Sequence, residues 1–238
     1  MVIKILSIGD ICAVSAQRCL AKIAKCDGVE ITCGVMSLPD ADLATHADAI
    51  VSDFPVYTFD YCADGSIRLN SEENCSFSYV MSMYDWDYIT INQRIDIADK
   101  EDTYFPYINE ISDFINEKSP NAKLVINEPW ALYSKHIDMS ARIREICISV
   151  AENTNINIVF PVGEVWEKIR LLYPELELST DDIKSSRLGD FVSGAVWYEV
   201  LTGYSIVKNN YRVPFANSKS VEKLRTVVHE VTEKYMLR

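Results

Sequence analysis

Short apolar runs and longer amphipathic segments alternate along this chain. Val2–Ile8 is rich in β-branched residues and ends at Gly9, which predicts a buried strand followed by a turn. Over Ala13–Lys25 the apolar residues recur with helical spacing, and Gly28 is placed to end that helix. A second strand is expected over Val29–Val35. This β-α-β opening predicts a right-handed crossover between parallel strands.

The same alternation predicts three further strands, over Tyr88–Asn92, Lys123–Asn127 and Ile156–Phe160. Further helices are expected over Tyr104–Glu117, about Met139–Ala151, from Pro161, and over Gly189–Leu201 and Ser220–Met236. Between Pro55 and Asn70 the period changes to two around an Asp-Gly pair, which indicates a small antiparallel β-hairpin excursion beside the main sheet. Five parallel strands with intervening helices predict a flavodoxin-like three-layer α/β/α sandwich. No Pro/Gly-rich linker interrupts residues 1–238, so we expect a single domain.

Charge and hydropathy narrow the function classes. The chain has 23 Lys and Arg against 35 Asp and Glu, a net charge of -12, and no basic patch is visible in the sequence. Nucleic acid is therefore not an expected partner. No apolar stretch approaches the roughly 20 residues of a membrane span. The N-terminal apolar run is too short for a signal peptide and lacks a small-residue cleavage site, so we expect a cytoplasmic protein that does not bind membranes.

Motifs for cofactors and metals are absent from the sequence. No two of the eight glycines are separated by a single residue, which excludes a G-x-G-x-x-G dinucleotide loop, and no P-loop is present. The three histidines lie far apart, and no C-x-x-C pair occurs. The seven cysteines follow no disulfide-scaffold pattern and are expected to be reduced, buried small hydrophobic residues. We expect neither a cofactor nor a metal.

Polar residues follow the first strand, at the edge where open α/β sheets bind ligands. They are Asp10, Cys12 and Ser15. Backbone N–H groups at the start of the next helix would stabilise an oxyanion at this point. A catalytic thiolate needs a neighbouring base, and only His136 among the histidines falls near a predicted strand-end loop. Packing at the helix start is therefore the favoured interpretation of Cys12.

Three further candidates follow later strands. The side-chain amide of Gln93 either donates to a substrate oxygen or caps its loop. An exposed Trp130 would stack on a sugar face, whereas a buried one would only pack in the core. Glu164 falls in the first turn of a helix, where the helix dipole alone accounts for an acidic residue.

Asp181 and Lys184 form the last candidate pair, just before the helix expected to begin at Gly189. Asp181 precedes Lys184 by three residues, a spacing at which a carboxylate can orient the side chain of its partner across one helical turn. A lysine acts as a general base at neutral pH only if deep burial lowers its pKa by about three units from about 10.4. A solvated ion pair is the favoured interpretation.

Four segments occur in an order typical of one superfamily: Lys4–Asp10, Asp87–Gln93, Pro161–Glu164 and Leu188–Gly203. Together they resemble a bacterial branch, of unknown function, of the SGNH (GDSL-type) hydrolase superfamily, from residue 3 to about residue 203. The resemblance implies an SGNH-hydrolase-like sandwich and serine esterase chemistry on carbohydrate or lipid esters, without a metal.

This sequence departs from the superfamily pattern at the catalytic positions. In that pattern the serine follows I-G-[ND], and the aspartate and histidine come late as D-x-x-H. Here the serine position is Ile11 and the histidine position is Lys184, whereas Asp181 and the amide position, Gln93, match. In the turn after the second strand, Val35 stands where the pattern has a glycine. Loss of the serine and the histidine removes the proton-transfer unit of the triad.

We therefore expect an SGNH-hydrolase-like protein that binds a small polar or carbohydrate ligand without ester hydrolysis. Its expected contacts are Asp10, Ser37, Gln93, Trp130, Glu164, Asp181 and Lys184. The alternative is an active carbohydrate or acyl esterase with rebuilt catalytic residues. In that alternative Cys12 or Ser15 is the nucleophile, or Asp10 and Asp181 activate water. A structural or protein-interaction role has no positive sign in the sequence.

Overall fold

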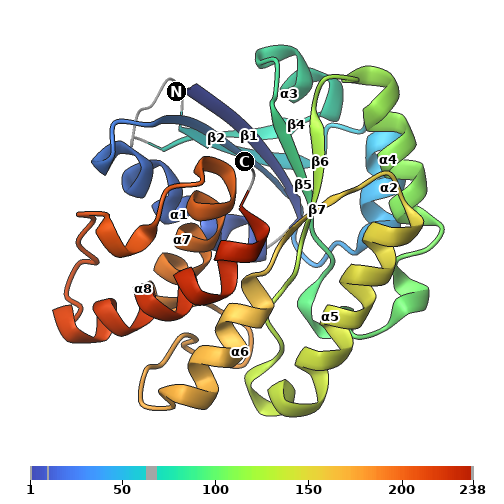
Figure 1. The fold of residues 1–238 in the computed structure, drawn as a ribbon. Helices are drawn as coiled ribbons and strands as arrows, with labels where there is room; N and C mark the ends of the chain where they lie inside the picture. Colours follow the sequence, from blue (N-terminus) through green and yellow to red (C-terminus); the bar gives the residue numbers. More distant parts are fainter. Residues whose placement is uncertain (1, 10, 63–68, 237–238) are drawn as a thin grey trace.

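The computed structural model describes residues 2–9, 11–62 and 69–236 of the chain. A central sheet is covered by helices on both faces (Figure 1). The strands are β1 (Val2–Gly9), β2 (Glu30–Ser37), β3 (Tyr57–Cys62), β4 (Asn70–Cys75), β5 (Tyr88–Ile91), β6 (Lys123–Asn127) and β7 (Ile158–Phe160). The main helices are α1 (Ile11–Cys26), α2 (Leu43–Val51), α3 (Phe77–Met83), α4 (Tyr107–Lys118), α5 (His136–Asn153), α6 (Val162–Leu172), α7 (Arg187–Thr202) and α8 (Ser218–Thr232).

The sheet has the expected parallel core. Five strands run parallel in the order β2-β1-β5-β6-β7. Counted along the chain, the order of the parallel strands is 2-1-3-4-5, which is the flavodoxin-like arrangement. The predicted three-layer α/β/α sandwich is therefore confirmed.

The β-hairpin differs from the expectation in one respect. Strands β3 and β4 do not lie beside the sheet but extend it beyond β2, so the sheet has seven strands rather than five. The physical reason is that pairing with β3 satisfies the backbone groups along the edge of β2. The Asp64-Gly65 pair that predicted the turn lies outside the described residues.

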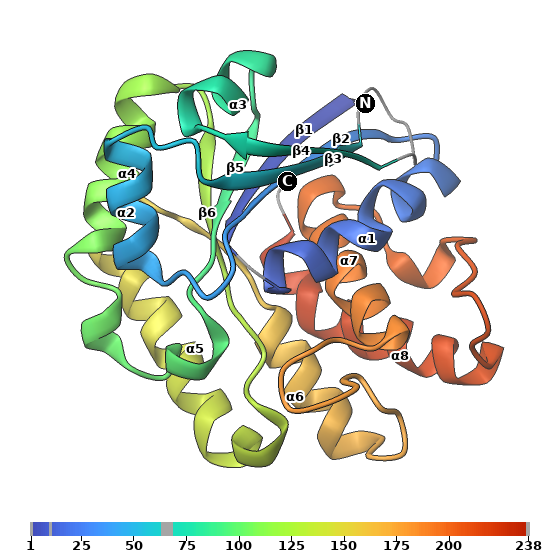
Figure 2. The ribbon, with the colours of Figure 1, turned by 180° about the vertical axis from the view of Figure 1, so that it is seen from behind.

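Helices α1, α7 and α8 cover one face of the sheet, and α2, α4 and α5 cover the other (Figures 1 and 2). Helix α6 contacts α5 as well as α7 and α8. Helices α2 and α3 were not predicted from the sequence, and they are only nine and seven residues long. Each has an N-cap side chain, Asp42 accepting from the Thr45 N–H and Ser76 from the Tyr79 N–H. Helix α5 begins at His136, earlier than expected.

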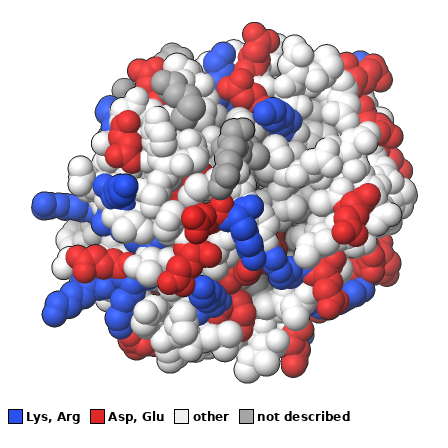
Figure 3. All heavy atoms as spheres, in the orientation of Figure 1, with Lys and Arg blue, Asp and Glu red and all other residues white. Residues whose placement is uncertain are grey.

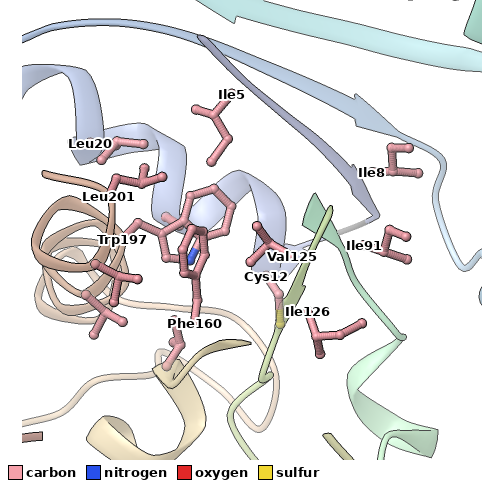
Figure 4. Packing of buried hydrophobic residues seen from close by; sticks show 14 of the residues in the cluster. Ile5, Ile8, Cys12, Leu20, Ile91, Val125, Ile126, Phe160, Trp197 and Leu201 are labelled. Atoms are coloured by element: carbon pink, nitrogen blue, oxygen red, sulfur yellow. The ribbon is translucent and has the colours of Figure 1, made fainter. Parts of the chain in front are cut away.

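The core lies between the sheet and both helical layers, and its most closely packed part joins α1 to α7. On this side Trp197 of α7 lies against Phe160 of β7, with ring centroids 5.0 Å apart, and Ile5 and Leu20 lie nearby (Figure 4). Gly194 allows the two helices to approach each other. A Cβ at this position would lie 2.9 Å from the Ala16 carbonyl oxygen and 3.1 Å from Cys19 Cβ.

All seven cysteines are free, and five of them are buried. The expectation of buried small hydrophobic residues is wrong for two, because Cys26 is exposed and Cys62 is half-buried. Cys26 is the last residue of α1, and Cys62 is the last residue of β3. Both positions lie at the end of an element, where covering by a neighbouring element is incomplete.

Charged side chains of both signs are interspersed on the face shown in Figure 3. Within the described residues, no helix combines the length and the apolar character that a membrane crossing requires.

Replacing Gly194 with alanine tests the close approach of α1 and α7. Alanine normally favours a helix over glycine by about 1 kcal/mol. Here the added methyl group would press on the backbone of α1, so we expect Gly194→Ala to lower the free energy of unfolding by about 1–3 kcal/mol. Urea denaturation monitored by circular dichroism measures the change. Lys25→Ala, on the exposed side of α1, is the control and should stay within about 0.5 kcal/mol of the wild type. A stabilised G194A variant would contradict the packing described.

Candidate functional site

A buried network of amide hydrogen bonds joins the carboxyl ends of the parallel strands. Asn92, directly after β5, donates from Nδ2 to the Ile8 carbonyl oxygen at 2.9 Å. Its Oδ1 accepts from Asn127 Nδ2 at 2.8 Å, and Asn127 Oδ1 accepts from Trp197 Nε1 at 2.9 Å. A Cβ at Gly9, whose φ is +151°, would lie 2.6 Å from Asn92 Cβ. Glycine is therefore required where β1 passes this amide.

The Gln93 side chain, the predicted amide donor, is also buried and hydrogen-bonded within the protein. Its Nε2 donates to the carbonyl oxygen of Thr103 at 2.9 Å and to the Thr103 hydroxyl at 3.1 Å. Its Oε1 accepts from the backbone N–H groups of Leu43, at 3.2 Å, and Arg94, at 2.8 Å. Of the two interpretations of this amide, the contacts match loop capping.

Ile11 and Lys184 are the residues that the superfamily resemblance places at the serine and histidine positions. Ile11 is the first residue of α1 and packs, partly buried, against the core. Lys184 is exposed. Asp181 Oδ1 accepts from the backbone N–H groups of Ile183, at 2.9 Å, and Lys184, at 2.6 Å. These two bonds, that to Lys184 first, lower the pKa of Asp181, so the carboxylate stays ionised and closes its own loop.

The alternative nucleophiles are both buried. Ser15 donates to Asp190 Oδ1 at 2.9 Å, and the same oxygen accepts from the Ser185 hydroxyl at 2.5 Å. Asp190 also forms an ion pair with Arg18, at 3.2 Å. Cys12, in the first turn of α1, is 1 % exposed. In the part of the chain that the structure describes, neither side chain is therefore exposed to a substrate in solution.

Asp10 lies outside the described residues. The Ser37 hydroxyl, at the end of β2, donates to the Thr58 carbonyl oxygen at 3.4 Å. These two positions were expected among the ligand contacts.

One serine lies beside a histidine, but far along the chain from the first strand. Ser205 Oγ is 3.3 Å from His229 Nδ1, and Glu199 Oε1 is 3.2 Å from the same nitrogen. A catalytic triad uses the two ring nitrogens separately, one for the serine and one for the acid. This group therefore joins α7 to α8 and is not arranged for nucleophilic catalysis.

Trp130 is fully buried, and of its two interpretations this matches packing in the core. Its indole stacks on Trp166 with centroids 4.2 Å apart, and its Nε1 donates to the Ile183 carbonyl oxygen at 3.0 Å. The residue therefore anchors the loop that carries Asp181. Its burial follows from Trp166, which is contributed by a helix more than thirty residues later in the chain.

Glu164, in the first turn of α6, takes part in an ionic group near the C-terminus. It accepts from Lys234 Nζ at 3.0 Å and from the Tyr235 hydroxyl at 2.9 Å, and it pairs with Arg144. These contacts tie α6 to the end of the chain.

Glu128, directly after β6, is a carboxyl group with a raised pKa, and the sequence analysis assigned it no role. It is 2 % exposed, and Arg144 Nη1 lies 3.3 Å from its Oε2. Burial raises the pKa of Glu128 to about 8, against the lowering effect of the Arg144 guanidinium. Its position one residue beyond a buried parallel strand was the available signal.

A cavity of about 500 Å³ is lined by residues near the start of α5, the end of α6 and the segment that follows α6. Figure 1 shows where these two helices lie in the fold. It is lined by Tyr133, His136, Arg170, Pro174 and residues 176–182, which include Asp181 and Asp182. Asp182 holds the loop in place because its two carboxylate oxygens accept from Ser134, at 2.6 Å from the backbone N–H and 2.8 Å from the hydroxyl. Of the expected ligand contacts, Asp181 is thus the one that lines this cavity.

Arg170 is the most unusual side chain of this cavity. It is 8 % exposed, and its guanidinium lies between the rings of Trp166 and Tyr133, at 5.3 and 5.6 Å from their centroids. Nη1 donates to the Ala131 carbonyl oxygen at 2.9 Å, whereas Nε and Nη2 have no hydrogen-bond partner. Buried unpaired donors are costly, and they are rare in folded proteins. Tyr133 is 59 % exposed, and its ring also lies against that of His136, with centroids 6.0 Å apart.

The model of the DUF4886 family, described as a domain of unknown function, matches residues 4–231. The chain belongs to the DUF4886 family. No curated protein matches the sequence.

Solved structures place this DUF4886 protein among SGNH-like folds. A DUF4886 family protein from Bacteroides uniformis has a TM-score of 0.92 and 18 % identity, over 97 % of this chain and 94 % of that one. A candidate SGNH hydrolase from Slackia heliotrinireducens has a TM-score of 0.58 and 17 % identity, over 84 % and 98 %. A lipolytic G-D-S-L family protein from Veillonella parvula has a TM-score of 0.54 and 12 % identity, over 85 % and 100 %. The fold that the sequence resemblance implied is therefore confirmed.

Among residues 2–9, 11–62 and 69–236, no group of three or more His, Cys, Asp or Glu side chains is placed to hold a metal ion.

Glu128 makes the stability of this protein depend on pH. The folded state keeps the Glu128 proton up to about pH 8, whereas the unfolded chain releases it near 4.5. Over this interval the unfolded state binds fewer protons, so a rise in pH favours unfolding. We expect the melting temperature to fall by at least ~3 °C between pH 5 and pH 8. Differential scanning calorimetry measures it.

Glu128→Gln isolates this contribution because glutamine keeps the shape and cannot ionise. The difference in melting temperature between E128Q and the wild type should grow as the pH rises, in favour of E128Q. Glu117→Gln, at an exposed position of α4, is the matched control and should leave the pH profile unchanged. Parallel profiles for E128Q and the wild type would show that Glu128 titrates normally.

Proposed function

We propose that this protein is a non-catalytic SGNH-like member of its family that binds a small neutral sugar or related polyol. The binding site is the cavity between the start of α5 and the end of α6. The observation that carries the proposal is Arg170, which lines the cavity and whose buried Nε and Nη2 have no hydrogen-bond partner.

The absence of ester hydrolysis is inferred from three positions. Acyl transfer by the superfamily needs a hydroxyl and an imidazole, and the chain has Ile11 and Lys184 at those places. The nearest hydroxyl on α1, that of Ser15, donates to Asp190 inside the core. Lys184 is exposed, whereas a lysine acts as a general base at neutral pH only when it is deeply buried.

The preference for a neutral polyol follows from the charges around the cavity. Glu177, Asp181 and Asp182 line it with three carboxylates against the single guanidinium of Arg170, and hydrogen bonds lower the pKa of both aspartates. An anionic ligand would be repelled, whereas hydroxyl groups donate to carboxylates and accept from a guanidinium. The exposed ring of Tyr133 offers the aromatic surface on which a sugar face packs. The sequence reading assigned that role to Trp130, three residues earlier.

Calorimetric titration with a panel of neutral monosaccharides, disaccharides and uronic acids tests the proposal. We expect one class of neutral sugar to bind, with uronic acids weaker. Tyr133→Ala should weaken binding by about tenfold or more, because a stacked ring contributes on the order of 1–2 kcal/mol. Arg170→Gln should weaken it further. Arg142→Gln, on the exposed side of α5 and outside the cavity, is the control and should leave binding unchanged.

The same preparations distinguish the alternative of a rebuilt esterase. We expect no hydrolysis of p-nitrophenyl acetate or acetylated sugars above the buffer rate. Turnover that Ser15→Ala or Cys12→Ala abolishes would establish the alternative. Sugar binding that Tyr133→Ala and Arg170→Gln leave intact would refute the proposed site.

A further inference from the structure

A second cavity, of about 460 Å³, lies along the outer side of α1 and shares no lining residue with the first. Its walls come from α1, from the β2–β3 edge of the sheet, from the start of α7 and from residues 211–214. It exists because the hairpin extends the sheet beyond β2. Figure 2 shows β3 and β4 continuing the sheet on the side of α1.

The floor of this cavity is mostly apolar. Cys33 and Val35 alternate along β2 on one face, and they pair directly with Cys62 and Asp60 of β3. The further apolar lining comes from Val14, Cys19, Ala21, Leu69, Val213 and Pro214. A volume between about 300 and 1,000 Å³ with such a lining is typical of small-molecule sites.

Three cations surround the cavity in a chain whose net charge is -12. Arg18 and Lys22 lie one turn apart on α1, and Arg187 begins α7. Two carboxylates also line it. Asp190 is paired with Arg18 and accepts from two serine hydroxyls, so among the described lining residues Lys22 and Arg187 remain against the carboxylate of Asp60. The balance of charge at the rim is therefore positive and attracts an anion.

Apolar surface continues from the cavity toward Phe215. Pro214 lines the cavity, and Phe215, the next residue, is 94 % exposed. The guanidinium of Arg187 lies 4.9 Å from the centroid of the Phe215 ring. Phe215 has a φ of +62°, which costs energy for a bulky side chain and persists only where surrounding structure imposes it. The exposed ring and the cation thus lie together beside the opening.

We propose that this cavity binds an amphipathic carboxylate, with its aliphatic body on the β2–β3 floor and its carboxylate at Lys22 and Arg187. The apolar floor accepts the chain by removing it from water. The cations accept the carboxylate through charge-assisted hydrogen bonds. A neutral polyol is disfavoured here because the floor offers few hydrogen-bond partners. This site does not depend on the function proposed above.

Titration calorimetry with decanoate, decanol and decyltrimethylammonium, below their micelle concentrations and at low salt, tests the proposal. Decanoate should bind, decanol should bind at least tenfold more weakly, and the cationic probe should not bind. Raising the salt to 0.5 M should weaken decanoate binding, because the rim cations are exposed. Equal affinities for decanoate and decanol would overturn the proposal, since the cations would then have no part in recognition.

Variants locate the two halves of the ligand. Lys22→Gln and Arg187→Gln should each weaken decanoate binding about five- to tenfold while leaving decanol unchanged. Lys25→Gln, on the same helix but outside the cavity, is the matched control and should have no effect. Cys62→Phe, at a half-buried position of the floor, should block both decanoate and decanol. Failure of C62F to reduce either affinity would place the binding elsewhere.

The Tyr133→Ala variant separates this proposal from the sugar site. Decanoate affinity should be the same in Y133A as in the wild type, whatever the result of the sugar panel. A loss of decanoate binding in Y133A would overturn the assignment to the α1 cavity.

Discussion

The buried amides at the carboxyl ends of β1, β5 and β6 determine how this end of the protein is arranged. Asn92, which follows β5, bonds both the end of β1 and Asn127, the last residue of β6. Trp197 of α7 completes the chain of hydrogen bonds. Each polar group is far from water, so the loss of one partner would leave another unsatisfied at a cost of about 1–3 kcal/mol. The network therefore requires glycine at position 9 and holds the first strand, the middle of the sheet and one covering helix in fixed positions.

The polar side chains at this end of the sheet are used for internal hydrogen bonds. Side chains that would serve a substrate in an esterase are occupied inside the protein, the Gln93 amide by Thr103 and the Ser15 hydroxyl by Asp190. Unsatisfied polarity instead appears at the outer end of α6, in the guanidinium of Arg170. Positive charge and apolar surface line the separate cavity beside α1. The two cavities differ in character because one is formed by polar loops and the other by a sheet face.

Much of the fold followed from local pattern. The five parallel strands are apolar runs because both of their faces are covered. Helix α1 ends at Cys26, shortly before Gly28, as expected. The hairpin was indicated by a change to period two, yet its pairing with β2 depends on a long-range contact that no local pattern contains. Helices α2 and α3 are too short for a clear amphipathic period, and their N-cap residues were the remaining signal. The candidate site could not be predicted from the sequence, because Arg170 and Tyr133 occur in no recognisable motif.

The sequence by itself determined the flavodoxin-like α/β sandwich, and it has Ile11 and Lys184 at the positions that the superfamily resemblance assigns to the serine and the histidine. These depend on residue type and on periodicity along the chain. Only the tertiary structure decided that Trp130 is buried, that Glu128 holds a proton near neutral pH, and that Arg170 lies unpaired beside a cavity. Exposure, pKa and hydrogen bonding are set by which distant segments come into contact, and folding alone brings Trp166, Arg144 and Tyr133 to those residues.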